Sequence, residues 1–425
     1  MKDRIKLAVI GLGNRGLGML KNPIIPMKEE GIDVVAVCDP LKDRVDTAVN
    51  ALLQSGAEKP FATTDYKEVL SLKELDAVYI ATSWESHVEI AVAAMKAGKY
   101  VGLEVGGAYS LDDCYKLIHT YEETGTELMF MENCCYGKRE LMMLNMVRQG
   151  IFGEVVHCNG AYSHDLRKEI ITGLENRHYR LRNYIYRNCE NYPTHEIGPI
   201  AKLLNINNGN RFLTLSSFSS RAKGMHEYTV KTKGADHPLA KVDFAQGDVV
   251  TTVITCAGGQ TVCITLETCL PRGYSRRFEV HGTKGMYMED NDSIFIDGNE
   301  EHQKNEFDWK PMWGNAEKFE EEYLHPLWKS GKTENDMHGG IDHLTVYAFI
   351  NAVKTGAHAP IDVYDAATYM SISVLSEDSI ALGGAPVAIP DFTAGRWTER
   401  VDIADNEYTL DNLDIGKDLY HIDKK

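Results

Sequence analysis

The chain has 425 residues, of which 43% are apolar and 25% charged, and this balance is typical of a folded protein of two or three domains. Its formal charge of −17 and the lack of a Lys/Arg-rich run argue against nucleic acid as a partner. No stretch approaches the roughly 18 consecutive apolar residues of a membrane span, and no cleavable leader precedes the first apolar run. We therefore expect a cytoplasmic protein with no membrane partner. The nine cysteines show no C-x-x-C spacing, which predicts neither a disulfide framework nor a zinc site.

The first predicted strand, residues 5–10, leads into a loop with the spacing G-x-G-x-x-G. Alone, this pattern also fits ordinary tight turns. A strand before it and a helix after it make it typical of the loop that holds the pyrophosphate of a dinucleotide. The residues of this loop that we expect to contact the cofactor are Gly11, Gly13, Asn14, Arg15 and Gly16.

The next apolar run ends in Asp39, 23 residues after Gly16. A carboxylate at this position can accept hydrogen bonds from the adenosine ribose and would repel a 2′-phosphate, so the sequence predicts NAD rather than NADP. Lys42 and Arg44 lie close by in the sequence and leave NADP as the alternative.

Strands and helices then alternate, which predicts a Rossmann domain with a doubly wound parallel sheet over residues 1–132. Predicted helices cover 42–55, 87–98 and 111–125, and predicted strands cover 77–82, 100–105 and 127–133. Ligands of such sheets bind at the carboxyl ends of the strands, so Trp84, His87, Glu104 and Val105 are further candidates for cofactor contacts. The alternative for the first two is a core tryptophan and a surface histidine.

Residues 133–397 show apolar alternation broken by glycine turns, which predicts an α+β domain with a large, mainly antiparallel open sheet. Predicted strands include 212–219, 249–256, 260–267, 276–282 and 293–297, and predicted helices cover 138–149, 194–204, 316–329, 337–354 and 363–382. Helices on one face would leave the other free for a cleft or a subunit contact, and we expect a homo-oligomer. Residues 398–425 are predicted to be a polar tail that wraps the surface or is partly disordered.

The order of these domains resembles the glucose–fructose oxidoreductase and inositol dehydrogenase superfamily. Members usually carry Glu-Lys-Pro after the fifth strand, whereas this chain has Glu104, Val105 and Gly106, so the usual lysine is missing. Several motifs together resemble one branch, the NAD-dependent glycosidases of glycoside hydrolase family 109, from Gly11 to Trp397. These motifs are MENCCYG, GAYSHDLR, YRLRNYIYRNCENYPTHEIGPIAKLLNINNGNRF, LPRGYSRR, GTKG, HGGIDHL and GAPVAIPDFTAGRW.

The resemblance implies an NAD-dependent glycosidase acting on N-acetylgalactosaminides or related hexosaminides. In that family, hydride leaves C3 of the sugar for NAD+, and the resulting ketone acidifies the hydrogen on C2. Elimination expels the C1 substituent, water adds, and the hydride returns. This route requires no pair of carboxylates at the separations found in ordinary glycosidases, but it requires a base for the C3 hydroxyl and further groups for proton transfer.

The stretch ENYPTHEIGP holds the expected base. Pro193 is predicted at the first position of a helix, after a cap at Asn191 or Tyr192. Tyr192 and His195, three residues apart, would share one helical face. A neutral imidazole can accept a hydroxyl proton near neutral pH, so His195 is the expected base in place of the missing lysine.

By resemblance, Tyr192, Tyr274 and His164 are candidates for the remaining proton transfers, and Glu132 and Arg180 are candidates for binding the sugar. The alternative for each is a packing or scaffold role. The residues His338, Asp342 and His343 are spaced like metal ligands on one helix. Since this segment begins a helix and the reaction requires no metal, we expect no metal site.

Two other functions remain open. The chain could be a sugar 3-dehydrogenase that releases a 3-keto glycoside, in which case NADH would accumulate in stoichiometric amounts. It could also be a regulatory protein that senses NAD or a sugar without catalysis.

Overall fold

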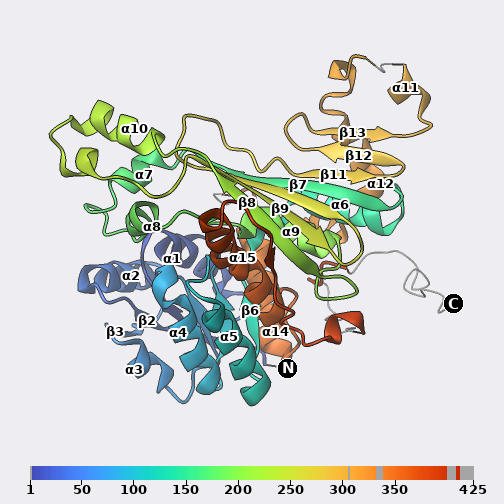
Figure 1. Ribbon diagram of the computed structural model, residues 1–425. Helices are drawn as coiled ribbons and strands as arrows, with labels where there is room; N and C mark the ends of the chain where they lie inside the picture. The colour runs from blue at the N-terminus through green and yellow to red at the C-terminus, as the bar shows by residue number, and fades with distance from the viewer. Residues whose placement is uncertain (1, 305–306, 332–337, 400–407, 412–425) are drawn as a thin grey trace. The chain divides into compact units, whose positions relative to one another are not determined.

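The computed structural model describes residues 2–304, 307–331, 338–399 and 408–411 (Figure 1). The chain forms two compact units. The first contains the described residues within Met1–Asn133, Thr333–Val374 and Asp402–Thr409, and the second those within Cys134–Lys332, Leu375–Val401 and Leu410–Lys425. The two units interleave along the chain, because residues 338–374 group with the first unit. The division expected from the sequence, 1–132 and 133–397, instead assigned these residues to the second domain.

The first unit is built on a six-stranded parallel sheet in the order β3-β2-β1-β4-β5-β6. Its strands are β1 (Ile5–Ile10), β2 (Ile32–Cys38), β3 (Phe61–Thr63), β4 (Ala77–Ile80), β5 (Tyr100–Leu103) and β6 (Leu128–Phe130). Strand β1 pairs in parallel with both β2 and β4, so the strand order reverses there. Such a switch point is where doubly wound sheets bind their ligands. The predicted Rossmann sheet is confirmed.

Helices surround this sheet. They are α1 (Asn14–Met19), a π-helix (Leu20–Ile24), α2 (Lys42–Gln54), α3 (Tyr66–Leu70), α4 (Trp84–Lys96), α5 (Leu111–Thr124) and α14 (Ile341–Thr355). Local sequence explains their ends: Ser110 caps α5 by accepting a hydrogen bond from the Asp113 N–H at 3.1 Å, and Gly125 ends it in the left-handed conformation. Helix α14 reaches β5 at Gly102, where a Cβ atom would come within 3.0 Å of the Phe349 ring.

The second unit contains an eight-stranded sheet in the order β13-β12-β11-β7-β10-β9-β8-β14. Its strands are β7 (Val155–Ser163), β8 (Phe212–Ser219), β9 (Val249–Cys256), β10 (Thr261–Glu267), β11 (Glu279–Gly282), β12 (Gly285–Met288), β13 (Ser293–Ile296) and β14 (Val387–Ala388). Only β7 and β10 pair in parallel among the described strands of this sheet. The predicted mainly antiparallel sheet is therefore confirmed.

Every second residue of β9 and β10 is buried. Successive side chains of a strand point to opposite faces, so this pattern gives the sheet one buried face. The helices of the second unit are α6 (Lys138–Arg148), α7 (Arg167–Ile171), α8 (Arg180–Tyr186), α9 (Thr194–Leu203), α10 (Gly224–Lys233), α11 (Glu300–Gln303), α12 (Glu320–Tyr323) and α13 (Pro326–Lys329). Helix α15 (Val363–Ala381) contributes residues to both units. Helix α9 packs on β7 at Gly160, where a Cβ atom would lie 3.2 Å from the Glu196 Cβ.

Three helix predictions require correction. The single helix predicted over 316–329 is wrong: a 3-10 turn (Asn315–Phe319), α12 and α13 replace it, because Pro326 forces the residue before it into an extended conformation. The helix predicted from residue 337 begins at Ile341, after a left-handed Gly340, and residue 337 lies outside the described residues. Pro193 is not the first helical residue, since α9 begins at Thr194 with Pro193 at the N-cap.

The predicted tail over 398–425 falls mostly outside the described residues. Within its described part, Tyr408, Thr409 and Leu410 are buried. Among the described helices, none combines the length and the apolar character that a membrane span demands.

Candidate functional site

The glycine loop after β1 has the geometry of a phosphate-binding turn. Gly11 has φ +93°, and a Cβ atom there would lie 2.5 Å from the carbonyl carbon of Ala81. At Gly16 a Cβ atom would lie 1.9 Å from the Gly11 oxygen. Both positions therefore require glycine. Gly13, at the N-cap of α1, is different, because a Cβ atom there would meet only the Arg44 guanidinium, at 3.4 Å. The N–H groups of a first helical turn have no partner within the helix and favour an anion, so Gly13 is a candidate for contact with the pyrophosphate.

Asp39 follows β2 and is 3% exposed. Its carboxylate accepts hydrogen bonds from the backbone N–H groups of Leu12, at 2.8 Å, and Leu41, at 2.9 Å. The Arg44 guanidinium lies 3.8 Å away. These contacts tie the carboxylate to the glycine loop and to the start of α2. Contact of Asp39 with an adenosine ribose stays a prediction.

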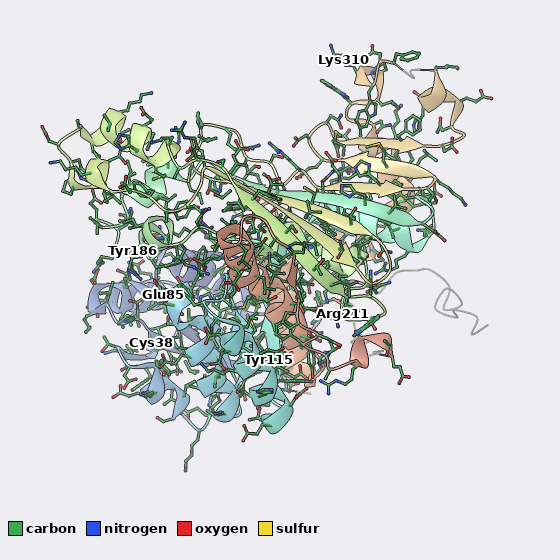
Figure 2. The ribbon with its side chains drawn as sticks, in the orientation of Figure 1. Cys38, Glu85, Tyr115, Tyr186, Arg211 and Lys310 are labelled. Atoms are coloured by element: carbon green, nitrogen blue, oxygen red, sulfur yellow. The ribbon has the colours of Figure 1, made fainter. Side chains whose placement is uncertain are left out.

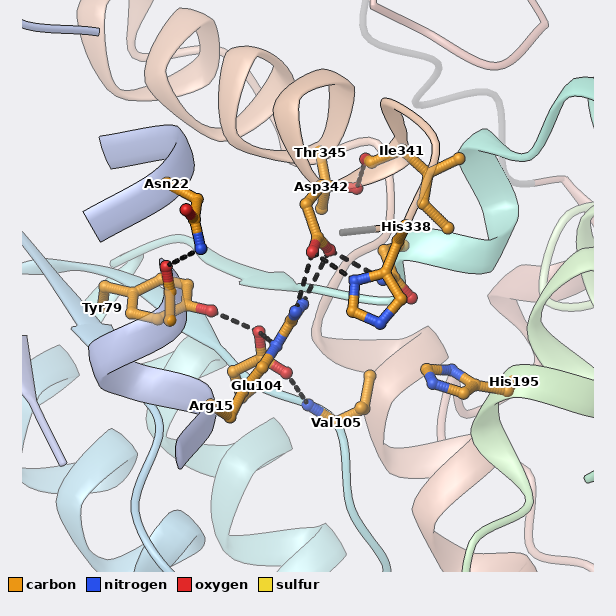
Figure 3. Close-up of polar contacts among 12 residues, drawn as sticks. Arg15, Asn22, Tyr79, Glu104, Val105, His195, His338, Ile341, Asp342 and Thr345 are labelled. Carbon is orange, nitrogen blue, oxygen red and sulfur yellow. Dashed lines mark hydrogen bonds and ion pairs between the residues drawn. The ribbon is translucent and has the colours of Figure 1, made fainter. Parts of the chain in front are cut away.

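Arg15 and Glu104 are bound to each other in a buried network (Figure 3). The Arg15 Nε donates to the Glu104 carboxylate at 2.8 Å, and the two terminal nitrogens donate to Asp342 at 2.9 and 2.8 Å. The Tyr79 hydroxyl also donates to Glu104. Contact of Arg15 or Glu104 with the cofactor stays a prediction, but the structure shows that both hold α1 to β4, β5 and α14.

Asp342, in the first turn of α14, accepts two further hydrogen bonds, from Asn133 Nδ2 at 2.7 Å and from His338 Nδ1 at 2.6 Å. Burial raises the pKa of its carboxyl group, yet the hydrogen bonds from His338 and Arg15 outweigh burial and hold that pKa well below its usual range. Asp342 is thus an ionised hub of the network. Two of the three residues with metal-like spacing, His338 and Asp342, bind each other here.

Trp84 and His87 lie on α4 and are both buried, so the surface alternative for His87 is wrong. A Cβ atom at Gly106 would lie 2.3 Å from the Trp84 ring, which shows how closely the indole covers that glycine. The His87 Nε2 donates to the Thr82 carbonyl at 3.0 Å. Burial lowers the pKa of His87 to about 4, so its imidazole is neutral at neutral pH. Their contact with a nicotinamide remains a prediction.

Two further predicted residues of the first unit also follow strands. Val105 comes two residues after the end of β5 and is 6% exposed, and Glu132 comes two residues after the end of β6 and is fully buried. Parallel strands end at one edge of their sheet, so both belong to the edge that carries Asp39 and Glu104.

In the second unit, the structure brings the predicted aromatic and histidine residues together around Tyr162. The Tyr162 ring centroid lies 4.6 Å from that of Tyr192, 5.6 Å from that of His195 and 5.7 Å from that of His164. Tyr274 completes the cluster, 5.2 Å from His164. We call these five residues the aromatic cluster. Tyr186, labelled in Figure 2, ends α8 and is 77% exposed, so it presents its ring to solvent instead.

Tyr192 and His195 are in direct polar contact. The Tyr192 oxygen lies 3.3 Å from His195 Nε2, and the two rings meet edge to face. His195 occupies the second position of α9 and Tyr192 precedes the N-cap, so the start of the helix fixes their separation. A proton can pass between the two groups along this contact.

Arg180 supplies positive charge to the cluster. Its guanidinium carbon lies 4.9 Å from the centroid of the Tyr192 ring, and its Nε lies 3.5 Å from a Glu169 oxygen. Burial lowers the pKa of His164 and the nearby Arg180 charge lowers it further, so His164 is neutral near neutral pH. The Tyr162 oxygen lies 3.2 Å from His164 Nδ1 and orients this imidazole.

Two members of this region were not predicted from the sequence. Tyr162 is the centre of the aromatic cluster, and the period of two along β7 could have revealed it, because residues 162 and 164 face the same side of an extended segment. Arg276 is partly buried and its guanidinium is paired with Glu140 at 2.5 Å, which anchors the loop that carries Tyr274. No spacing in the sequence indicated that pair.

Two protein families match this chain, one over its N-terminal part and one over most of the remainder. Residues 5–131 match the oxidoreductase family, NAD-binding Rossmann fold, so the first unit is an NAD-binding domain and the predicted cofactor is confirmed. Residues 136–399 match the family described as glycosyl hydrolase 109, C-terminal domain.

Relatives cover almost the whole chain. It is 40% identical to a glycosyl hydrolase family 109 protein of Stenotrophomonas maltophilia, with 94% of this chain and 91% of the relative covered. It is 38% identical to the alpha-N-acetylgalactosaminidase of Tannerella forsythia, with 93% of this chain and 88% of the relative covered. The chain belongs to glycosyl hydrolase family 109 and is an enzyme of that family.

Solved structures share the fold. Levoglucosan dehydrogenase in complex with NADH and levoglucosan gives a TM-score of 0.69 at 17% identity, with 91% of this chain and 100% of that chain covered. The myo-inositol 2-dehydrogenase of Lactobacillus plantarum gives a TM-score of 0.64 at 14% identity, with 91% and 100% covered. This likeness shows that the chain has the fold of these two dehydrogenases.

Proposed function

We propose that this enzyme is an NAD-dependent glycosidase that cleaves N-acetylgalactosaminides or related N-acetylhexosaminides by transient oxidation at C3. One observation carries the proposal: the Tyr192 oxygen lies 3.3 Å from His195 Nε2, in a chain where Val105 stands in place of the lysine usual after the fifth strand. This contact supports His195 as the base for the C3 hydroxyl in place of the missing lysine. The relative from Tannerella forsythia, described as an alpha-N-acetylgalactosaminidase, supports the substrate class.

NAD, when bound, supplies a single chemistry, the removal of a hydride from C3 of the sugar and its later return. Gly11, Gly13 and Asp39 would hold its pyrophosphate and ribose. Every other requirement falls on side chains that bind the sugar or move protons.

His195 accepts the proton of the C3 hydroxyl in this proposal, and Tyr192 holds the imidazole and can share that proton. Once C3 is a ketone, the hydrogen on C2 becomes acidic. In this proposal His164, whose imidazole is neutral, and Tyr274, which is 55% exposed, take that proton and assist the leaving oxygen. Arg180 holds an oxygen of the sugar or of its acetamido group, and Glu132 holds a sugar hydroxyl.

The test is a panel of nitrophenyl glycosides hydrolysed in deuterated water, with the α-N-acetylgalactosaminide as the lead compound. We expect turnover without added NAD, no net accumulation of NADH, and replacement of the C2 hydrogen by deuterium. His195→Ala should abolish both hydrolysis and exchange while NAD remains bound. His226→Ala, the same change at an exposed histidine of α10, is the control and should keep both.

Other outcomes would contradict parts of the proposal. Stoichiometric NADH would favour a sugar 3-dehydrogenase that releases a 3-keto glycoside. Hydrolysis without deuterium at C2 would exclude the ketone route. Undiminished exchange in His195→Ala would remove His195 as the base.

A further inference from the structure

Two buried carboxyl groups flank the residues proposed to act on the C3 hydroxyl. Glu190 precedes Tyr192 by two positions and is fully buried, and Glu196 directly follows His195 and is 2% exposed. One oxygen of Glu196 accepts a hydrogen bond from the Thr265 N–H at 3.0 Å. The other oxygen of Glu196, and both oxygens of Glu190, have no hydrogen bond of ordinary geometry from the described residues.

The two side chains interact directly with each other. Burial raises the pKa of Glu190 to about 8, and the backbone N–H groups of Tyr192 and Leu266 only partly oppose it. Burial and the neighbouring Glu190 raise the pKa of Glu196 well above its usual range, although His195 lowers it. Two buried carboxylates that interact directly strongly disfavour ionisation of both, so the pair retains at least one proton at neutral pH.

The residues around the pair leave the retained proton to bridge the two carboxyl groups. The Glu190 N–H donates to the Ser376 hydroxyl at 2.8 Å, which fixes the chain before the helix. Glu196 lies over Gly160 of β7, where a Cβ atom added to Gly160 would lie 3.2 Å from the Cβ of Glu196. The titratable groups that act on the pair from these elements are His195 on α9 and the Cys189 thiol, whose pKa burial raises to about 12. Neither replaces the missing hydrogen-bond donor.

We propose that Glu190 and Glu196 share a proton in a carboxyl–carboxyl hydrogen bond that closes the chain around the start of α9 and so positions Tyr192 and His195. This inference rests on the proposed function for its catalytic consequence, but the shared proton itself does not. Both glutamates are positioning residues, because they act through the tyrosine and the histidine. The bond exists only while the pair keeps its last proton.

The shared proton can be observed without substrate. Infrared spectra of the wild-type enzyme should contain the C=O stretching band of a protonated carboxyl group at neutral pH, and this band should disappear as pH is raised. Glu190→Gln should remove the pH-dependent band. Glu154→Gln, the same change at an exposed carboxylate of the same unit, should leave it intact. A wild-type spectrum without the band at neutral pH would overturn the shared proton.

The positioning role is tested by comparing two substitutions at one site. In Glu196→Gln the amide N–H can donate to Glu190 in place of the shared proton, whereas Glu196→Met keeps the bulk and loses the bond. We expect Glu196→Met to lose about a hundredfold in kcat with little change in KM, since a small displacement of a base acts on the chemical step, and Glu196→Gln to recover most of that loss. Equal kcat values in the two variants would refute positioning.

The two proposals fail in different ways. If the band and its pH dependence are present but no glycoside is hydrolysed, the carboxyl pair stands and the proposed reaction falls. If glycosides are hydrolysed through C2 exchange but the band is absent, the reaction stands and the pair falls.

Discussion

Asp342 offers the sharpest test of how the NAD-binding unit is held together. It is 3% exposed and its two oxygens accept four hydrogen bonds, two from Arg15 and one each from Asn133 and His338. Asp342→Asn keeps the shape but turns one acceptor into a donor that faces other donors. Of the two carboxylates that pair with Arg15 among the described residues, Glu104 would then be left to balance its positive charge.

The expected loss follows from the cost of breaking a buried ion pair on one side, about 3–5 kcal/mol. The Arg15 side chain is 31% exposed to solvent, and an asparagine at position 342 still offers one acceptor oxygen. We therefore expect a loss of unfolding free energy at the lower end of this range, about 3 kcal/mol. Asp46→Asn is the control, because it removes an exposed i,i+4 pair with Lys42, which contributes about 0.3–0.5 kcal/mol.

The assay is urea-induced unfolding followed by circular dichroism, with the midpoint of the first transition compared among the three proteins. Asp342 has a folded pKa below its unfolded value, so its stabilisation is present above about pH 4 and is lost as pH falls toward the folded pKa. The difference between wild type and Asp342→Asn should therefore shrink in acid. A difference below about 1 kcal/mol at pH 7, or one that does not change in acid, would show that the Asp342–Arg15 pair does not stabilise the unit in this way.

Three further predictions concern binding and catalysis. Gly11→Ala should abolish NAD binding and lower the thermal midpoint, because its Cβ would overlap the backbone of Ala81, whereas Gly13→Ala should keep the midpoint and weaken NAD binding measured by calorimetry. Tyr192→Phe removes only the hydroxyl that contacts His195, so kcat should fall about a hundredfold with an unchanged thermal midpoint, and unchanged kcat would exclude it from proton transfer. Arg180→Met should raise KM for N-acetylated substrates more than for substrates without the acetamido group, and an equal effect on both would contradict acetamido binding.

Local patterns in the sequence were enough to predict both sheets. Strands β8 and β9 were predicted with their observed bounds, because strict alternation and glycine turns are local signals. Strand β12 (Gly285–Met288) and helix α10 (Gly224–Lys233) were not predicted. Strand β12 is four residues long and follows a turn, and α10 carries charged and apolar residues without a clear helical stripe, so neither produces a periodic signal.

The buried network of the first unit could not be predicted from spacing. Arg15 and Asp342 are 327 positions apart, and each also fitted another role, the arginine as a phosphate contact and the aspartate as a metal ligand. Such pairs form because folding brings two segments to one place, and a single sequence contains no record of that proximity. In the aromatic cluster, Tyr192 and His195 were predicted together because they are close in sequence, and the family resemblance added His164 and Tyr274. Tyr162 was not predicted, since it meets Tyr274 only in three dimensions.

The same distinction explains why Glu190 and Glu196 escaped notice although they lie beside the proposed base. In a sequence, a glutamate in the first turn of a helix is an ordinary surface residue that favours the helix dipole. Here the helix start is buried against β7 and β10, so the carboxyl group of Glu196 is shielded from solvent, and its one hydrogen bond of ordinary geometry from the described residues comes from the Thr265 N–H. A protein tolerates such a group at a cost, and the cost is smallest when a second acid shares its proton. Two acids buried beside a proposed base are therefore consistent with a need to hold that base in one position. A solvent-exposed helix start would hold it less rigidly.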